Sequence, residues 1–424
     1  MTRSSVTPQP AAQAHPGRPL GGRVAQAEMR AANMGLILRH LRSQGGRSRA
    51  QLAGETGLSK ATTSSLIADL AERGLVREGE FVRGGAVGRP GQTVTIDGAT
   101  VTGVGVELSV DFAAITAVTL AGTVVRESVT PLDVAHLGIS TVLDRTATLL
   151  GRMLTSLTEQ GVEVVGVTVS PPGVIDYDTG TLRFAPNLGW RSVPLVAELT
   201  KRLGPGAPPI RLENDAKLAA IAEYDHLAKE GVRDLLFLSG EVGVGAGIIA
   251  DGRLMRGYSG FSGEVGHLPL DPSGSPCNCG RRGCWELAVG LNAFLGLAAD
   301  EGDSPRDPNR ALEDRLLTLT ERAAAGDERT LDALATVTER LAEGLGILVD
   351  VLNPRMIVLG GYYAYFGDQI IPPLAEALAA RRMDEGSAAV LRTSAAGFMS
   401  TARGGALLAL EDVFDDPNRV AVRD

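Results

Sequence analysis

The spacing of hydrophobic positions divides the chain into two parts. In the first hundred residues, Met34, Ile37, Leu38 and Leu41 recur every three or four positions, which predicts a helix over residues 27–44. Beyond residue 100 the pattern changes to strand-rich runs that alternate with helical ones. We therefore expect a small helical head followed by a larger α/β body.

Two shorter helices are predicted after the first one. Ser48 is a suitable N-cap for a helix over residues 49–56, and Gly57 can supply the tight turn that follows. Ser59 can cap a second helix that ends at Gly74. Two short helices joined by a glycine turn are typical of a DNA-reading helix-turn-helix. The second helix would bury a stripe at positions i, i+3, i+4 and i+7, formed by Thr63, Leu66, Ile67 and Leu70.

Small polar side chains of the second helix lie off that stripe and could reach phosphates and base edges. Residues 75–97 resemble two strands joined by a glycine-rich tip that carries Arg83 and Arg89. A basic hairpin beside a reading helix follows the DNA backbone or enters a minor groove. We therefore predict a winged helix-turn-helix; the alternative is a three-helix domain with a solvated hairpin. The predicted contacts with double-stranded DNA are Ser59, Lys60, Thr62, Ser64, Ser65 and Arg89.

The body has the alternation expected of an α/β fold, and its length of about 300 residues is enough for two lobes with a cleft. A last helix over residues 401–415 is predicted to pack back on the first lobe. The strand-rich runs cover residues 101–110, 113–125, 164–176, 234–254 and 354–361. The helical runs include residues 140–160, 195–203, 214–230 and 328–350.

Charge is unevenly distributed along the 424 residues. The net charge of −9 argues against a nucleic-acid partner, but residues 1–100 hold 13 Lys and Arg against 7 Asp and Glu. A basic head on an acidic body indicates that the head alone meets an anionic partner. No run of eighteen apolar residues predicts a membrane span. Residues 1–24 lack an apolar segment and are expected to form a disordered tail, not a signal peptide.

All three cysteines lie between Ser262 and Glu286. Their crowding argues against a disulfide framework and favours a reducing cytoplasm as the location. With one histidine they form the pattern H-x9-C-x-C-x4-C, and three sulfurs with one nitrogen suit tetrahedral Zn²⁺. A complete set of four ligands leaves no open position, so the predicted zinc is structural. The predicted ligands are His267, Cys277, Cys279 and Cys284.

Four stretches of the body together resemble the ROK family, which joins sugar kinases and sugar-responsive repressors. They are "PPGVIDYDTGTLRFAPNLGW", "ENDAKLAA", "SGEVGVGAGIIADGRLMRGYSGFSGEVGH" and "CNCGRRGCWE". The resemblance covers nearly the whole chain beyond the tail. It implies a two-lobed actin/hexokinase-like (ribonuclease H-like) body with a zinc loop. The repressor branch of the family also begins with a winged helix, whose Gly-Arg-Pro wing is similar to residues 88–90.

The resemblance also implies a sugar site and a domain division. His267 would use one ring nitrogen for zinc and the other for the sugar. The sugar-binding residues that it implies are Asn187, Asn214, Asp215, Glu264, His267 and Glu286. The expected division is a tail (1–24), the winged helix-turn-helix (25–98), a first lobe (99–213 with 400–424) and a second lobe with the zinc loop (214–399).

The general base of the family's kinases is matched here by Asp215, so this residue does not distinguish a kinase from a repressor. The two phosphate-binding loops do distinguish them. Those kinases carry Asp-x-Gly-Gly-Thr where this chain has residues 107–111, "ELSVD", and Gly-Thr-Gly where it has Glu241 and Val242. Side chains prevent the close approach of the backbone to phosphates, and acids repel them. We therefore predict that kinase activity is lost and that Asp215 is a vestigial base.

The resulting prediction is a non-enzymatic, sugar-responsive repressor of genes for carbohydrate uptake or catabolism. It would bind operator DNA as a homodimer or a dimer of dimers, as palindromic sites require. One alternative is an ATP-dependent sugar kinase with a DNA-binding head. Another is a repressor that responds to a protein partner or to a phosphorylated sugar.

Overall fold

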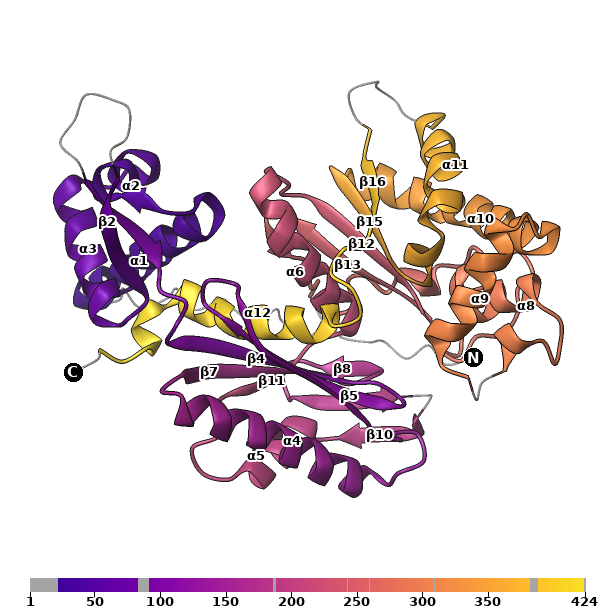
Figure 1. Cartoon of the computed structure of the whole chain (residues 1–424), viewed down its shortest axis with the longest axis horizontal. Coiled ribbons are helices and arrows are strands. Elements are labelled where there is room, and N and C mark those ends of the chain that lie inside the picture. Colours follow the sequence, from indigo (N-terminus) through magenta and orange to yellow (C-terminus); the bar gives the residue numbers. More distant parts are fainter. Residues whose placement is uncertain are drawn as a thin grey trace, which may run out of the picture.

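Figure 1 shows the computed structural model, in which three α/β units are arranged around one long C-terminal helix. The structure describes residues 22–82, 91–185, 188–241, 243–258, 260–307, 310–381 and 388–422. None of the described helices is long and apolar enough to cross a membrane.

The head is a winged helix-turn-helix, as predicted. Ser48 and Gln51 form a capping box, Gly57 has a φ of 74°, and the Ser59 hydroxyl accepts a hydrogen bond from the Thr62 N–H. The wing tip, with Arg83 and Arg89, lies outside the described residues. The helices are α1 (Gly22–Gln44), α2 (Arg49–Thr56) and α3 (Lys60–Glu72), and a sheet of order β1-β3-β2 is made of β1 (Arg47–Ser48), β2 (Val76–Val82) and β3 (Gly91–Ile96).

The first sheet of the body is a mixed parallel and antiparallel sheet of order β11-β7-β4-β5-β6. Large side chains lie on one of its faces and glycines on the other. Val104, Val106 and Leu108 pack in one core with α4 (Ile139–Glu159) and α5 (Leu195–Leu203). The strands are β4 (Val101–Leu108), β5 (Phe112–Thr119), β6 (Val124–Pro131), β7 (Glu163–Ser170) and β11 (Ile210–Leu212). A small sheet beside it contains β8 (Val174–Asp176), β9 (Thr181–Ala185) and β10 (Trp190–Val193).

The second sheet has the order β14-β13-β12-β15-β16 and carries helices on both faces. One face packs on α6 and the other on α8, α10 and α11. The strands are β12 (Leu235–Gly240), β13 (Val244–Ala250), β14 (Arg253–Leu254), β15 (Met356–Gly361) and β16 (Val390–Thr393). The helices are α6 (Asp215–Leu227), α7 (Glu286–Val289), α8 (Leu291–Ala298), α9 (Leu312–Ala324), α10 (Glu328–Leu352) and α11 (Gly367–Ala379). Short 3-10 turns are η2 (Ala228–Glu230), η3 (Val265–His267), η4 (Ser304–Arg306), η5 (Tyr362–Phe366) and η7 (Pro417–Arg419).

The predicted C-terminal helix, α12 (Ser400–Asp415), does pack back on the first sheet (Figure 1). A Cβ atom at Gly105 of β4 would lie 1.8 Å from the Ala402 carbonyl oxygen, so α12 approaches the backbone of the strand directly. At Gly404 the same helix approaches the Leu218 carbonyl oxygen of α6, where a Cβ atom would again lie at 1.8 Å. Because α6 covers the second sheet, α12 joins the two halves of the body.

The other end of α12 holds the head. Leu410, Val413 and Phe414 of α12 share one apolar core with Ile37 and Leu38 of α1. The head is therefore packed on the body through a continuous hydrophobic core.

We expect Gly404→Ala to lower the free energy of unfolding by about 1–3 kcal/mol or more, because its Cβ atom would clash with the α6 backbone. Gly296→Ala is the matched control. It lies in the exposed middle of α8 with open space around it, so the alanine is expected to raise stability by about 0.5–1 kcal/mol. Urea unfolding of the two variants measures both effects, and equal effects would contradict the close crossing of α6 and α12.

Candidate functional site

The first turn of α6 presents Asn214 and Asp215 directly after β11. The Asn214 side-chain oxygen accepts the Lys217 N–H at 3.2 Å and so caps the helix. The Asp215 carboxylate accepts the Ala216 N–H at 2.7 Å. These local hydrogen bonds fix both side chains at the N-terminus of α6.

Glu264, His267 and Glu286 converge on one another. The His267 Nε2 atom lies 3.9 Å from a Glu264 carboxylate oxygen, and its Nδ1 atom lies 3.5 Å from a Glu286 oxygen. The three side chains are partly exposed, at 39%, 25% and 17% respectively. Gly263, which has a φ of 90°, lies in close contact with the backbone of β13, and this contact positions Glu264 against the strand. This geometry leaves polar atoms of all three residues accessible to a ligand.

Asp215 lies close enough to join this group. Burial raises the pKa of the Glu264 carboxyl, His267 and Lys217 oppose that rise, and Asp215 and Glu286 add to it. The structure therefore brings together Asp215, Glu264, His267 and Glu286 from three separate segments. Asn187, the remaining predicted sugar contact, lies outside the described residues.

His267, Cys277, Cys279 and Cys284 form a cluster that could hold a metal ion, because their ligand atoms all lie within 4.8 Å of one another. The Cys279 and Cys284 sulfurs are 3.6 Å apart, and the Cys277 sulfur is 3.9 Å from His267 Nδ1. Ligands of a tetrahedral ion with bonds near 2.3 Å lie about 3.8 Å apart, so the donor set fits. With Nδ1 on the sulfur side, His267 Nε2 faces Glu264, as the predicted double use of the ring requires.

Three carboxyl groups, which we call the acidic trio, interact electrostatically with one another: Glu107, Asp215 and Glu241. Burial and then repulsion from Glu241 and Asp215 raise the pKa of Glu107. Burial and repulsion from Asp215 raise the pKa of Glu241 to about 7, although part of this side chain is exposed and water screens some of the repulsion. Burial also raises the pKa of Asp215, against the hydrogen bond from Ala216.

Glu107 is the member of the acidic trio that has a carboxylate oxygen without a hydrogen-bond partner. One of its carboxylate oxygens is buried without a hydrogen-bond partner, and so is the hydroxyl oxygen of Ser170, its neighbour across β4 and β7. Asp111, the other acid of residues 107–111, is exposed. It lies in the tight turn between β4 and β5, where the Ser109 N–H donates to the Phe112 carbonyl oxygen at 2.9 Å.

Lys217 is a residue of the site that sequence analysis missed. It is 1% exposed, and its ammonium donates hydrogen bonds to the Gly260 carbonyl oxygen and, at 3.0 Å, to the Tyr177 hydroxyl. Burial lowers its pKa, whereas Glu213 and Glu264 oppose that change. Lys217 thereby ties the segment before Glu264 to α6. A lysine within the otherwise apolar run "AKLAAIA" was the signal that could have found it.

The predicted DNA contacts on α3 face outward. Ser59, Lys60, Thr62 and Ser65 are exposed, whereas Ser64 is half-buried. The Ser59 and Thr62 hydroxyls hydrogen-bond each other at 2.8 Å within the helix cap. Lys60 therefore carries the positive charge at the start of this face.

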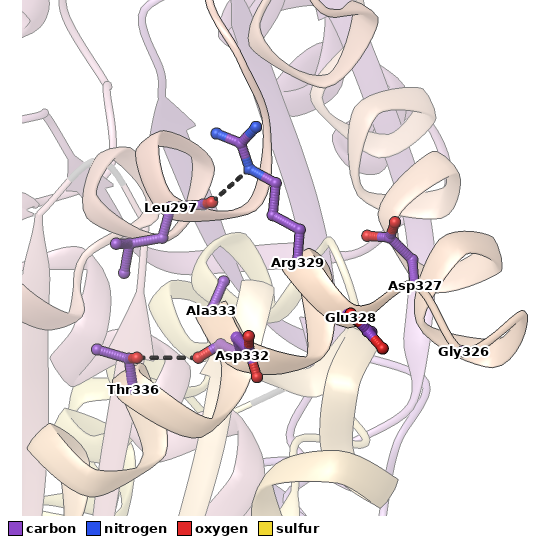
Figure 2. Close-up of a pocket in the computed structure, with 8 residues that line it drawn as sticks. All are labelled: Leu297, Gly326, Asp327, Glu328, Arg329, Asp332, Ala333 and Thr336. Atoms are coloured by element: carbon purple, nitrogen blue, oxygen red, sulfur yellow. Dashed lines mark hydrogen bonds between the residues drawn. The ribbon is translucent and has the colours of Figure 1, made fainter.

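A surface hollow of about 730 Å³ lies elsewhere, at the start of α10 (Figure 2). Its polar groups bind one another: the Arg329 Nε donates to the Leu297 carbonyl oxygen at 2.9 Å, and Asp327 caps α10 by accepting from Thr330. None of the predicted site residues lines it, so we do not assign it to the sugar site. Its lining is Leu297, Gly326, Asp327, Glu328, Arg329, Asp332, Ala333 and Thr336.

Comparison with known proteins supports both parts of this architecture. The chain is 28% identical over 350 residues to a xylose repressor of Caldicellulosiruptor bescii, a match that covers 78% of this chain and 83% of the relative. It is 28% identical over 335 residues to a xylose repressor of Bacillus subtilis, covering 79% and 83%. It is also 33% identical over 235 residues to a glucokinase of Halalkalibacterium halodurans, covering 53% and 70%.

Solved structures show the same fold. A ROK family transcriptional regulator, a homolog of the E. coli MLC protein, aligns with a TM-score of 0.74 at 21% identity, over 92% of this chain and 97% of that one. A ROK family glucokinase from Streptomyces griseus, in complex with glucose and AMPPNP, aligns with a TM-score of 0.59 at 25% identity, over 73% and 99%. The kinase alignment thus leaves about a quarter of this chain uncovered.

Family models match both parts of the chain. Residues 35–85, within the winged helix-turn-helix, match the MarR family. Residues 104–412, which include both sheets, the acidic trio and the cysteine cluster, match the ROK family model, and the chain belongs to the ROK family.

Proposed function

We propose that this protein is a sugar-responsive transcriptional repressor. The observation that carries the proposal is that a winged helix-turn-helix and a ROK body form one packed unit, joined by the core between α1 and α12. Relatives named xylose repressor match about four-fifths of the chain, which supports the same reading. Its place of action would be the cytoplasm, where operator DNA is found.

The sugar would bind at the group formed by Asn214, Asp215, Glu264, His267 and Glu286, with Asn187 as a further contact. Carboxylates, an amide and an imidazole suit this work because each sugar hydroxyl both donates and accepts hydrogen bonds. Xylose is the first candidate, because the named repressors share the largest part of the chain. Asp215, held in place by the cap of α6, would bind a hydroxyl without activating it for transfer.

The acidic trio supports loss of kinase activity. ATP would bring several negative charges next to Glu107 and Glu241, and one carboxylate oxygen of Glu107 is buried without a hydrogen-bond partner. The similarity to glucokinases is the observation that favours the alternative, a kinase with a DNA-binding head. Both proteins would bind sugar, so ATP binding distinguishes them.

DNA would be bound by the outward face of α3, where Lys60 and Ser65 are exposed and Ser59, Thr62 and Ser64 lie beside them. Lys60 would contact phosphate, and the shorter hydroxyl side chains would reach base edges. Arg89 of the wing would add a minor-groove or backbone contact. A homodimer or a dimer of dimers would place such helices on a palindromic operator.

The metal of the cysteine cluster would be structural Zn²⁺. Thiolate and imidazole ligands suit zinc, and four protein ligands leave no position for substrate. The ion would fix the loop of residues 268–284, and with it the positions of His267 and Glu286. It would hold the sugar site in shape without taking part in any reaction.

Cys284→Ser is expected to reduce the metal content from about one zinc per chain to near zero and to lower the melting temperature, because it removes a buried ligand. Ser273→Ala, in the same loop but outside the ligand set, is the matched control and should keep its metal. Elemental analysis of the purified proteins measures the content. A full zinc complement in Cys284→Ser would contradict the assignment.

Glu264→Gln is expected to weaken sugar binding about tenfold to a hundredfold, since it removes a charge-assisted hydrogen bond worth about 1.5–3 kcal/mol. Glu339→Gln, on the exposed face of α10, is the control and should leave the affinity unchanged. Calorimetric titration of zinc-loaded protein with xylose, other free sugars, sugar phosphates and ATP measures each affinity.

In the same titrations, wild-type protein should bind one free sugar and show no ATP binding, with or without that sugar. ATP binding that increases with sugar, together with phosphorylated product, would replace the repressor by the kinase alternative. Binding of a sugar phosphate alone would keep the repressor and change its effector.

Glu241→Gln should gain stability over the wild type as pH rises from 5 to 8. A carboxyl group with a raised pKa keeps its proton in the folded protein after the unfolded chain has released it. The wild type therefore loses stability between the ordinary value of 4.5 and about 7. Thermal unfolding at several pH values, with Glu339→Gln as control, measures the difference. A difference that does not change with pH would contradict the electrostatic description of the trio.

A further inference from the structure

One ion pair connects the head to the helix that carries the sugar site. Arg42, in the last turn of α1, donates from Nη2 to an Asp225 carboxylate oxygen of α6 at 2.9 Å. Its Nη1 donates to a Glu411 oxygen of α12, also at 2.9 Å, and its guanidinium lies 4.9 Å from the centre of the Phe414 ring. Arg42 therefore contacts both helices that cross in the middle of the molecule.

Asp225 is the buried partner in this arrangement. Its side chain is 6% exposed, compared with 21% for Arg42 and 40% for Glu411. The next cation, Arg403 of α12, is 3.8 Å away. Loss of Arg42 would leave a buried carboxylate with one distant partner, so the position of Arg42 is strongly constrained by α6.

The opposite end of α6 forms part of the sugar site. The helix begins at Asp215, is capped by Asn214, and through Lys217 holds the Gly260 carbonyl oxygen in the segment before Glu264. Its 13 residues form a rigid element about 20 Å long, with Asp225 in the last turn. A displacement of its first turn is thus carried to Asp225.

We propose that Arg42 and Asp225 are the positioning residues through which sugar occupancy sets the orientation of the DNA-binding head. This inference rests on the proposed repressor function. Sugar that binds at Asn214 and Asp215 favours one tilt of α6. The helix crosses α12 closely at Leu218 and Gly404, so a tilt about that crossing moves Asp225 and draws Arg42 with it.

Further polar contacts of the head are made with the C-terminal segment, and its apolar core also includes Val101 and Leu120 of the first lobe. Arg39 pairs with Asp415 of α12, and the Arg73 guanidinium donates to the Val420 carbonyl oxygen. These contacts, with the apolar core of α1 and α12, hold the head on the body at any tilt of α6. In the described part of the chain, Arg42 is the head side chain that forms an ion pair with α6.

The test uses full-length, zinc-loaded protein and an operator selected by the wild type from a random DNA library. The measured quantity is the ratio of operator affinities with and without saturating xylose, or whichever free sugar the titrations identify. In Arg42→Gln and Asp225→Asn the ratio should fall at least fivefold towards one. Asp415→Asn, which removes the Arg39 pair to α12, is the matched control and should keep the wild-type ratio.

A ratio that stays at the wild-type value in both Arg42→Gln and Asp225→Asn would overturn the inference, even if their melting temperatures fall, because a purely structural contact changes stability without changing coupling. If Asp225→Asn does not fold, Arg42→Gln decides alone, since Asp225 then keeps Arg403 as a partner. Wild-type protein that binds sugar and operator independently, or binds no sugar, would instead contradict the proposed function itself.

Discussion

The backbone contact between α12, β4 and α6 is the constraint on which the rest of the structure depends. Glycines at positions 103, 105 and 404 remove the side chains that would keep these elements apart, and helix, strand and helix approach to contact distance. An approach of this kind permits little sliding, because a single added methyl group meets a carbonyl oxygen. The two sheets and the head are consequently held together by packing on α12.

In the proposed function, one group of polar residues recognises sugar hydroxyls and a neighbouring group of acids disfavours phosphate. Asp215, Glu264, His267 and Glu286 lie together as a polar group beside the cysteine cluster, to which His267 also belongs. Close to Asp215, Glu107 and Glu241 add further carboxyl groups, and burial is the first cause that raises the pKa of each of the three. Sensing a sugar needs the first group of residues, whereas phosphoryl transfer from ATP needs the second region to be neutral or basic. The same fold can therefore serve as a sensor after only a few substitutions.

Local signals made much of this predictable from the sequence. The caps at Ser48 and Ser59, the turn at Gly57 and the H-x9-C-x-C-x4-C spacing each depend on neighbouring residues, and the structure has each as expected. Long-range contacts were not accessible. Neither the buried ion pair of Arg42 with Asp225, 183 positions apart, nor the tie from Lys217 to Gly260 leaves a periodic pattern in the chain.

The most direct test of the account is the affinity of a fluorescent operator fragment for the wild-type protein, measured by anisotropy at fixed salt while a free sugar is titrated. A repressor that couples the two sites should change its operator affinity at least fivefold with one free sugar and not at all with ATP. An operator affinity that no sugar changes, in a protein that converts sugar and ATP to sugar phosphate, would contradict it.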